Sequence, residues 1–471
     1  MTTYDEIIAK KEQHAPVVGF DADVTDEWLF PFQRHAVKWA LLGGRRALFM
    51  DTGLGKSRMQ LRWADAVASH TDGRILILAP LAVGPQTVGE ALAVGLCDIT
   101  FARSMADVGD ARIIVTNYDS LDKFSGLDVA GVVLDESSIL KSFMGRMRTQ
   151  IIERFSDVPY KLACTATPAP NDFDELGNHS EFLGVGTRLE MLSQFFLNDT
   201  SDTGTWRLKG HAVIPFWDWV ASWALCAGMP SDVGNYDDSA YILPPLNLRR
   251  HIVNVDIVSG AKEGAMFRLA DMSATNIHAE KRLTTEPRAD AVAAIVAAEP
   301  DEPWIVWCET NYEAEAIMAR LPKFAVEVSG SMSVEVKSSR LLGFSTGGGI
   351  LLTKSKIAGF GMNWQHCARV AFIGTSFSYE AFYQAIRRCW RFGQKRPVEA
   401  HVVLAYTDQA TWDVVSAKGE DHADMKRQMF AASRRAQNRA AALRSYNPTC
   451  HGRLPSWLHS LPTTTEEKCS A

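Results

Sequence analysis

A stretch of seven residues, DTGLGKS at positions 51–57, places glycines, a lysine and a serine in an order suited to binding phosphate. Gly53 and Gly55 let the backbone approach a ligand closely, and the free N–H groups at the start of a helix attract anions. Lys56 would reach the β- and γ-phosphates of a nucleotide, and the Ser57 hydroxyl would bind Mg²⁺. The usual motif begins with a glycine where this chain has a methionine, so the stretch alone leaves a plain turn open.

A pair of acids, Asp135 and Glu136, follows a continuous apolar run in GVVLDESS, residues 131–138. In a doubly wound sheet, ligands bind at the carboxyl ends of the strands. Asp135 would there hold the water shell of Mg²⁺, and Glu136 would orient and deprotonate an attacking water. Acids at strand ends also occur as solvated caps, but their spacing from the phosphate stretch, 79 positions between Lys56 and Asp135, favours nucleotide hydrolysis.

Short apolar strands that alternate with amphipathic helices must position these residues. In the first half of the chain we expect strands at 45–50, 74–80, 111–117, 131–136 and 160–166. In the second half we expect them at 304–310, 324–330, 348–355, 368–374 and 398–406. The phosphate stretch then lies between a strand and a helix. The sequence therefore predicts an α/β protein with two parallel-sheet units.

Two segments depart from this rhythm. Residues 185–250 are rich in tryptophan, and we expect an aromatic insert that packs on the first unit; the alternative is a surface on which nucleic-acid bases stack. A basic helix is expected at 413–446, with six Lys or Arg and no acid between Lys426 and Arg444. It is either a solvated helix or a brace across the two units, or else a contact to a nucleic-acid backbone.

The composition is that of a globular protein, with 46% apolar and 22% charged residues in 471. A formal net charge of −6 argues against a basic surface overall, but a groove can still be locally positive. No apolar run reaches the ~18 residues of a membrane span, and the N-terminus is too polar for a signal peptide. We therefore expect a cytoplasmic protein without membrane contact. Only Cys450, His451 and Cys469 offer a zinc-binding alternative.

Several short stretches occur in the order expected of superfamily 2 helicases and translocases: FPFQRHAVKWAL, DTGLGKS, LILAPL, VTNYDSL, VLDESS, CTATPAPND, GFGMNW and QAIRRCWRFGQ. Over roughly residues 28–406 the chain most resembles the Swi/Snf-like branch, whose phosphate loop commonly begins with an acid and lacks the first glycine. The tryptophan-rich insert is similar to that of compact phage-encoded members, which implies a host cytoplasm. The resemblance implies two tandem RecA-like domains, with ATP and Mg²⁺ as cofactors.

The resemblance also implies roles for individual residues, most of them around the nucleotide. Gln33 would read adenine, in a pocket shaped by Pro31 and Phe32. The residues implied in catalysis are Lys56, Asp135, Glu136, Gln384, Arg388 and Arg391. Those implied in nucleotide binding are Gln33, Thr52, Gly53, Leu54, Gly55, Lys56, Ser57, Gly359 and Gly361, and Ser57 and Asp135 would hold Mg²⁺ through water. Thr165, Thr167 and Asn363 would couple the phosphate state to domain closure.

Arg388 and Arg391 would lie on the far wall of the ATP cleft, where guanidinium groups stabilise charge that grows on the γ-phosphate. Arg387, one residue earlier, is expected to point elsewhere on the helix and to have no catalytic role. Contacts to nucleic acid would come from strand ends and would grip phosphates without reading bases. The matching residues are Pro80, Leu81, Thr116, Asn117, Ser329, Gly330 and Thr353.

The expected domain order is a segment at 1–27, a first RecA-like domain at 28–184, the insert at 185–250, a second RecA-like domain at 251–412, the basic helix and a tail at 447–471. We expect an ATP-dependent translocase on duplex DNA that binds without sequence preference and works with replication, recombination or restriction partners. One alternative is an RNA or single-strand helicase, and another is an ATP-gated clamp that holds nucleic acid without moving.

Overall fold

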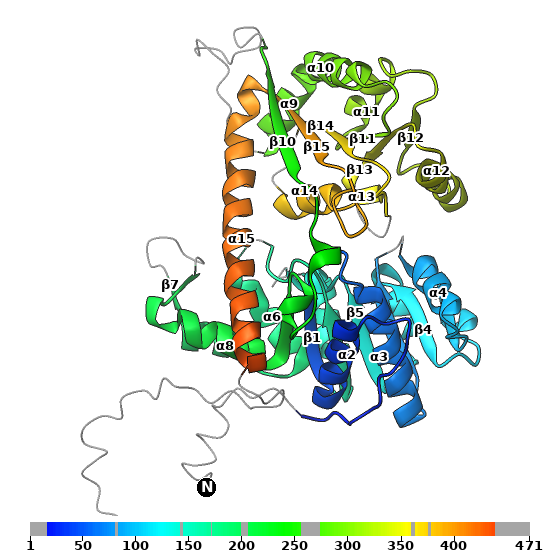
Figure 1. Ribbon diagram of the computed structural model, residues 1–471, viewed down its shortest axis with the longest axis vertical. Helices are drawn as coiled ribbons and strands as arrows, with labels where there is room; N and C mark the ends of the chain where they lie inside the picture. The colour runs from blue at the N-terminus through cyan, green and yellow to red at the C-terminus, as the bar shows by residue number, and fades with distance from the viewer. Residues whose placement is uncertain are drawn as a thin grey trace, which may run out of the picture.

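The computed structural model describes residues 17–80, 83–141, 145–170, 172–198, 206–255, 274–358, 363–374 and 378–438. It contains two lobes, each built on a parallel sheet that helices flank, and one long helix runs alongside both (Figure 1). The expected fold class is confirmed. Among the described residues, no helix has both the length and the apolar character that crossing a bilayer requires.

The first lobe contains a seven-stranded parallel sheet with the order β3-β4-β2-β5-β6-β1-β9. The strands are β1 (Arg45–Met50), β2 (Ile75–Ala79), β3 (Ile99–Phe101), β4 (Ile113–Asn117), β5 (Gly131–Asp135), β6 (Tyr160–Cys164) and β9 (Ala224–Ala227). The helices are α2 (Pro31–Gly43), α3 (Lys56–Thr71), α4 (Gly84–Ala93), α5 (Arg146–Arg154), α6 (Leu176–Leu183), α7 (Arg188–Phe195) and α8 (Val213–Trp223). All five strands expected here are present, within two residues at each end.

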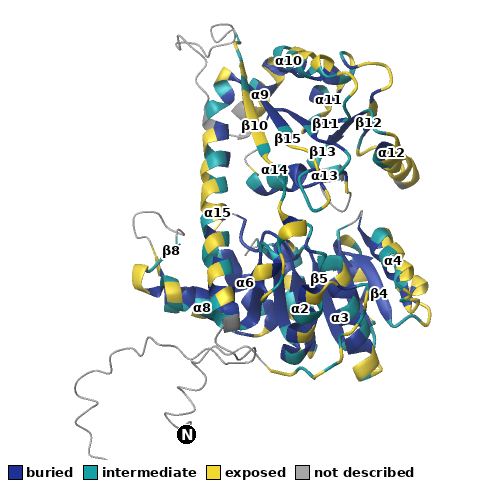
Figure 2. Cartoon of the chain, viewed as in Figure 1, coloured by how far each residue is buried: buried dark blue, intermediate teal, exposed yellow. Residues whose placement is uncertain are grey.

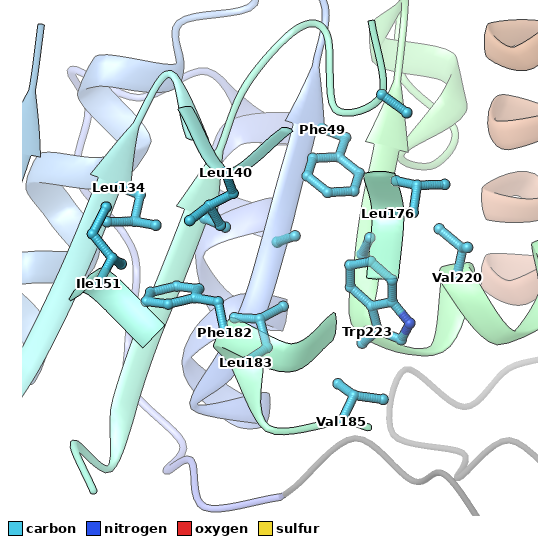
Figure 3. Close-up of a cluster of buried hydrophobic side chains, with 14 of the residues drawn as sticks. Phe49, Leu134, Leu140, Ile151, Leu176, Phe182, Leu183, Val185, Val220 and Trp223 are labelled. Atoms are coloured by element: carbon cyan, nitrogen blue, oxygen red, sulfur yellow. The ribbon is translucent and has the colours of Figure 1, made fainter. Parts of the chain in front are cut away.

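The strands read as continuous apolar runs because helices cover both faces of the sheet. Along β1, Ala47 and Phe49 face one core, while Leu48 and Met50 face the other. Figure 3 shows the first of these cores, where Phe49 lies near Leu176 and Trp223. In Figure 2 the sheet strands are mostly buried, whereas the helices alternate between buried and exposed positions.

The second lobe contains a six-stranded parallel sheet with the order β10-β15-β14-β11-β13-β12. Its strands are β10 (Leu246–Val253), β11 (Trp304–Cys308), β12 (Val326–Val328), β13 (Ile350–Lys354), β14 (Arg369–Ile373) and β15 (Val398–Ala405). Its helices are α9 (Ala274–Leu283), α10 (Thr285–Ala298), α11 (Asn311–Met318), α12 (Val334–Gly347), α13 (Ser355–Ala358) and α14 (Tyr379–Ile386). The five strands expected in this half are also present.

The tryptophan-rich segment packs onto the first lobe. Trp217, Trp219 and Trp223 of α8 are buried in the core of that lobe, which leaves these three no surface for bases to stack on. The segment also supplies β9, which pairs with β1 at the edge of the sheet, and an antiparallel hairpin of β7 (Phe196–Asn198) and β8 (Trp206–Leu208). The described tryptophans of α8 therefore serve packing.

The long helix α15 (Gln409–Asn438) connects the two lobes (Figure 1). Near its start, Trp412 and Val415 belong to a core of the second lobe. Further along, Met425 and Met429 belong to a core of the first. The helix thus lies where a brace across the two units would lie, which was one of the alternatives for the basic segment. Residues 439–446 of the expected helix lie outside the described residues.

Polar contacts attach the far half of α15 to the first lobe. The Ser433 hydroxyl accepts a hydrogen bond from the backbone N–H of Cys226, at 2.8 Å. Trp217 donates its indole N–H to Gln428, at 2.6 Å. Two of the basic residues form ion pairs with acids of the first lobe, Arg434 with Asp232 and Arg435 with Asp218. These two arginines are therefore occupied by protein partners.

Candidate nucleotide site between the lobes

A polar cavity of about 110 Å³ lies where the two lobes meet. The first lobe contributes Thr52, Gly53, Gly55, Lys56, Ser57, Val83, Gln86, Glu90, Asp135 and Glu136. The second lobe contributes Asn363, Arg387, Arg388 and Arg391. Three segments that are far apart in the sequence, around residues 52–57, 135–136 and 387–391, therefore share one cavity.

The loop between β1 and α3 has the conformation that its glycines allow. Gly53 and Gly55 have φ values of 93° and 82°, in the left-handed region that side chains disfavour. A Cβ at Gly55 would come within 2.2 Å of the Gln33 amide, and one at Gly53 would meet Phe392 at 3.0 Å. These two positions thus need glycine for both backbone and space.

Lys56 stands at the first position of α3 and points back over the loop. Its ammonium donates to the carbonyl oxygen of Met50, at 3.0 Å. Burial lowers the pKa of Lys56, and the nearby carboxylates of Glu136, Asp51 and Asp135 oppose that shift. The lysine side chain thus lies among acids, and a phosphate oxygen could replace the carbonyl as its partner.

The acidic pair closes β5, as expected. Asp135 accepts a hydrogen bond from the amide of Gln60, at 2.8 Å, and burial together with Glu136 raises the pKa of Asp135 to about 6. Glu136 has a φ of 54°, which is uncommon for a residue with a side chain and indicates a strained backbone. Such strain persists where the surroundings demand it, often at functional sites. The sequence did not indicate a role for Gln60, which lies one turn after Lys56. A glutamine among the apolar residues of a buried helix face could have indicated a polar partner there.

Gln33 lies beside the phosphate loop. Its side-chain oxygen accepts from the N–H of Phe30, at 2.9 Å, and its amide donates to the carbonyl of Leu54, at 2.8 Å. Both contacts hold the start of α2 against the loop. Pro31 is the first residue of this helix and Phe32 is buried beneath it. That Gln33 reads adenine stays a prediction.

An aromatic cluster that the sequence did not indicate lies next to Gln33. The ring of Tyr241, from the short helical turn η7 (Ser239–Tyr241), packs on Phe392 with centroids 4.7 Å apart and on Phe32 at 5.5 Å. Phe392 belongs to the second lobe, whereas Phe32 belongs to the first. An aromatic contact therefore joins the lobes on the side where Gln33 lies.

Arg388 and Arg391 reach the cavity from the second lobe. Burial lowers the pKa of both guanidinium groups to about 10, so both remain positively charged at neutral pH. Arg391 donates a hydrogen bond to the side-chain oxygen of Asn363, and its Nε is buried without a hydrogen-bond partner among the described residues. Gln384 instead points at Glu380, to which its amide donates at 3.4 Å.

The expectation that Arg387 points elsewhere is wrong. Its guanidinium lines the cavity and donates to both the hydroxyl and the carbonyl of Thr52, the latter at 2.7 Å. The reason is that α14 ends at Ile386, so Arg387 and Arg388 belong to the turn that follows rather than to a regular helix. A helical-face argument does not apply beyond the last helical residue.

Thr165 and Thr167 connect the acidic pair to the second lobe. The Thr165 hydroxyl donates to the Glu136 carboxylate at 3.2 Å and accepts from the N–H of Thr167 at 3.1 Å. The Thr167 hydroxyl donates to Glu380 at 3.3 Å, and Lys141 forms an ion pair with the same carboxylate. Glu380 was missed because nothing local in the sequence marks its partners, which lie more than 200 positions away.

The residues proposed to touch nucleic acid lie at strand ends but differ in exposure. Ser329 is half-buried and Gly330 is exposed, and Pro80 directly follows β2. Thr116, Asn117 and Thr353 are buried, and Thr353 donates its hydroxyl to a backbone carbonyl within the sheet, at 3.1 Å. Leu81, Gly359 and Gly361 lie outside the described residues, as do Cys450, His451 and Cys469. No group of three or more potential metal ligands is found in the described part of the chain.

One protein-family model matches part of the second half of the chain. Residues 287–393 match the family model of the helicase conserved C-terminal domain. This range contains the second-lobe residues of the cavity. A search of curated proteins finds no match.

Two solved structures match most of the chain. Dbp5 of S. cerevisiae, bound to RNA and ADP BeF3, matches with a TM-score of 0.55 and 13% identity, over 88% of this chain and 94% of that one. The SWI2/SNF2 ATPase core of Sulfolobus solfataricus, in complex with dsDNA, matches with a TM-score of 0.41 and 15% identity, over 87% and 98%. At 13% identity the likeness to Dbp5 concerns the fold, which is that of tandem RecA-like domains.

Proposed function

We propose that this chain, an ATPase of the superfamily 2 helicase type, is a motor of the Swi/Snf-like branch that moves along duplex DNA. The observation that carries the proposal is the cavity between the lobes. Lys56 faces it from one side, and Arg388 and Arg391 face it from the other. A triphosphate held there would contact both lobes at once, so its hydrolysis would change how the lobes are joined.

The residues around the cavity suit ATP and Mg²⁺. The glycine loop at the start of α3 offers backbone N–H groups to a phosphate, and the cationic side chains of Lys56, Arg388 and Arg391 can balance its charge. Ser57 and Asp135 offer the hard oxygen ligands that Mg²⁺ prefers. When bound, Mg²⁺ neutralises charge on the phosphate oxygens.

In the proposed reaction Glu136 accepts a proton from the attacking water. Lys56 holds the phosphates, and Arg388 and Arg391 stabilise the negative charge that develops in the transition state. Hydrogen bonds from Thr165 and Thr167 then connect Glu136 with the second lobe. Repeated closure and opening would advance the lobes along a nucleic-acid backbone.

Duplex DNA is the proposed polymer because the motif QAIRRCWRFGQ resembles that of the Swi/Snf-like branch. Contacts from strand ends would grip phosphates, which makes binding independent of sequence. A compact phage-type motor of this kind would act with replication, recombination or restriction partners in the host cytoplasm. The same proposal includes the domain limits expected from the sequence, the recognition of adenine by Gln33 and a contact between Gly330 and a nucleic-acid phosphate.

Measuring ATP hydrolysis with duplex DNA, single-stranded DNA and RNA tests the choice of polymer. We expect duplex DNA to accelerate hydrolysis most, and a Lys56→Ala variant to show no turnover with any polymer. Acceleration by RNA alone would mean that the chain is an RNA helicase. Displacement of a triplex-forming third strand tests movement, because a clamp that hydrolyses ATP without moving would leave the third strand bound.

A further inference from the structure

The carboxylate of Asp51, the first residue of the phosphate loop, binds several donors through one oxygen atom. Its Oδ1 accepts from the Thr52 N–H at 2.7 Å and from the Tyr383 hydroxyl at 2.7 Å. It also lies 3.2 Å from the Lys426 ammonium and 3.5 Å from the Arg387 guanidinium. Burial alone would raise the pKa of Asp51, but Arg387 and Lys426 hold it well below its usual range.

These donors come from separate parts of the fold. Thr52 belongs to the phosphate loop, Tyr383 and Arg387 belong to the second lobe, and Lys426 belongs to α15. Lys426 also donates to the Tyr383 hydroxyl, at 2.8 Å, and its ammonium lies 4.6 Å from the centre of the Tyr383 ring. Lys426 therefore contacts both the phosphate loop and the second lobe.

The position of Lys426 is determined by packing on the first lobe. Its neighbour Met425 is fully buried in a core of that lobe, as is Met429 one turn later. The Lys426 side chain is itself only 12% exposed, so it is not available to a polymer in solution. This residue is thus a fixed positive charge between the phosphate loop and α14.

Buried ion pairs add little net stability, because desolvation offsets most of the attraction between the charges. Their better attested use is to select one arrangement of the groups that they join. Here the arrangement brings the turn after α14 onto Thr52, and the same turn carries Arg388 and Arg391 into the cavity. The alignment of these two arginines thus depends on how α14 meets the loop.

We propose that Lys426 is a positioning residue for ATP hydrolysis: it holds Asp51 and Tyr383 together, so that Arg388 and Arg391 face the phosphates. This inference rests on the proposed ATPase function. It also assigns the long C-terminal helix a part in the reaction, in addition to joining the lobes. Losing Lys426 should slow the chemical step more than it weakens ATP binding.

The test compares Lys426→Met with the matched control Arg427→Met in the full chain. Arg427 is the next residue of the same helix, its side chain is 70% exposed, and its guanidinium pairs with Asp424 of the preceding turn. With saturating nucleic acid, we expect Lys426→Met to lower kcat about tenfold or more, since small misplacements of catalytic groups have effects of this size. KM for ATP should stay within about threefold, and Arg427→Met should match the wild type.

Two further variants separate positioning from folding. Lys426→Arg keeps the charge and should recover part of kcat. Tyr383→Phe removes only the hydroxyl that Lys426 and Asp51 share, and it should lower kcat in the same direction. Binding of a fluorescent ATP analogue and the melting temperature are measured on every variant.

The outcomes are distinct. A folded Lys426→Met variant with wild-type kcat overturns the inference. So does a loss of kcat that is accompanied by an equal loss of ATP binding, and so does a kcat that stays as low in Lys426→Arg as in Lys426→Met. Normal turnover in both Lys426→Met and Tyr383→Phe would leave the proposed ATPase function intact. A wild type that hydrolyses no ATP with any polymer overturns the proposed function itself.

Discussion

The hydroxyl of Thr167, in the first lobe, donates a buried hydrogen bond to Glu380, in the second lobe, at 3.3 Å. The N–H of Thr167 donates to Thr165, and the Thr165 hydroxyl donates to Glu136. Three consecutive hydrogen bonds therefore connect the proposed general base with α14. A change at Glu136 can therefore reach the second lobe through two threonine side chains and the backbone N–H of Thr167.

Glu380→Ala should weaken the communication between the lobes. The substitution removes the acceptor of Thr167 and the ion-pair partner of Lys141. Hydrogen bonds to charged groups contribute about 1.5–3 kcal/mol, which corresponds to about 10- to 100-fold in rate. We expect nucleic-acid-stimulated hydrolysis to fall by this factor, with unstimulated hydrolysis less affected. Glu315→Ala, an exposed acid of α11, is the control, and equal loss of both activities would contradict a coupling role.

Lys56→Ala and Glu136→Gln should each abolish ATP hydrolysis for different reasons. Lys56→Ala removes the cation that holds the phosphates, so ATP binding should fall as well. Glu136→Gln keeps the shape of the side chain but cannot accept the proton from water, so ATP should still bind. Turnover assays together with binding of a fluorescent ATP analogue distinguish the two, and near-normal turnover in either variant would refute the site.

Arg388→Ala should remove a positive charge that faces the γ-phosphate. Arginines in this role typically contribute ~10³ to 10⁵ in kcat, or about 4–7 kcal/mol. The control is Arg396→Ala, since that side chain is 44% exposed and pairs with Glu302 away from the cavity. Single-turnover hydrolysis measures the step directly. A change of less than tenfold would place Arg388 outside the reaction.

The raised pKa of Asp135 predicts a pH dependence of stability in the metal-free protein. Burial and Glu136 favour the protonated acid in the folded state, with a pKa of about 6 against 3.8 for the ordinary group. The folded state therefore binds more protons than the unfolded state. The contribution of Asp135 to the free energy of unfolding is fully present below pH ~4 and is lost as the pH rises through ~6. The loss amounts to up to about 3 kcal/mol.

Urea unfolding of the wild type and Asp135→Asn at several pH values checks this expectation. Asparagine does not titrate. Between pH 4 and pH 7 the wild type should therefore lose free energy of unfolding relative to the Asp135→Asn variant. A difference that is constant across this range would contradict the shifted pKa. Mg²⁺ should reverse the trend, because a bound cation favours the ionised acid.

Trp223→Ala tests whether the tryptophan-rich segment serves packing. Trp223 is fully buried and packs near Phe49 in the first-lobe core (Figure 3). Removing so large a side chain typically lowers the free energy of unfolding by ~3–5 kcal/mol. Chemical denaturation should show a loss of this size. An unchanged stability together with weaker binding of nucleic acid would favour the stacking alternative instead.

Local patterns in the sequence predicted much of the fold. Mainly apolar runs of six to nine residues marked ten of the strands within two residues at each end, because strands buried on both faces must be apolar throughout. The sequence did not indicate β3, β7, β8, β9 or β10, and the last four lie wholly or mainly in the segment assigned to the insert. β3, β7, β8 and β9 have only three or four residues each, and β10 is largely exposed, so none of them forms a long apolar run.

The sequence by itself determined that a phosphate-type loop follows a strand, that an acidic pair ends another, and that an arginine-rich motif lies far downstream. These signals are local, since glycine, lysine and acid types at short spacing express backbone and charge requirements directly. Only the tertiary structure decided that Arg387 reaches Thr52, that Glu380 accepts from Thr167, and that Lys426 meets Asp51. Each of these contacts joins residues more than 200 positions apart, and such pairs are created by the packing of whole lobes and of α15 rather than by any neighbouring residue.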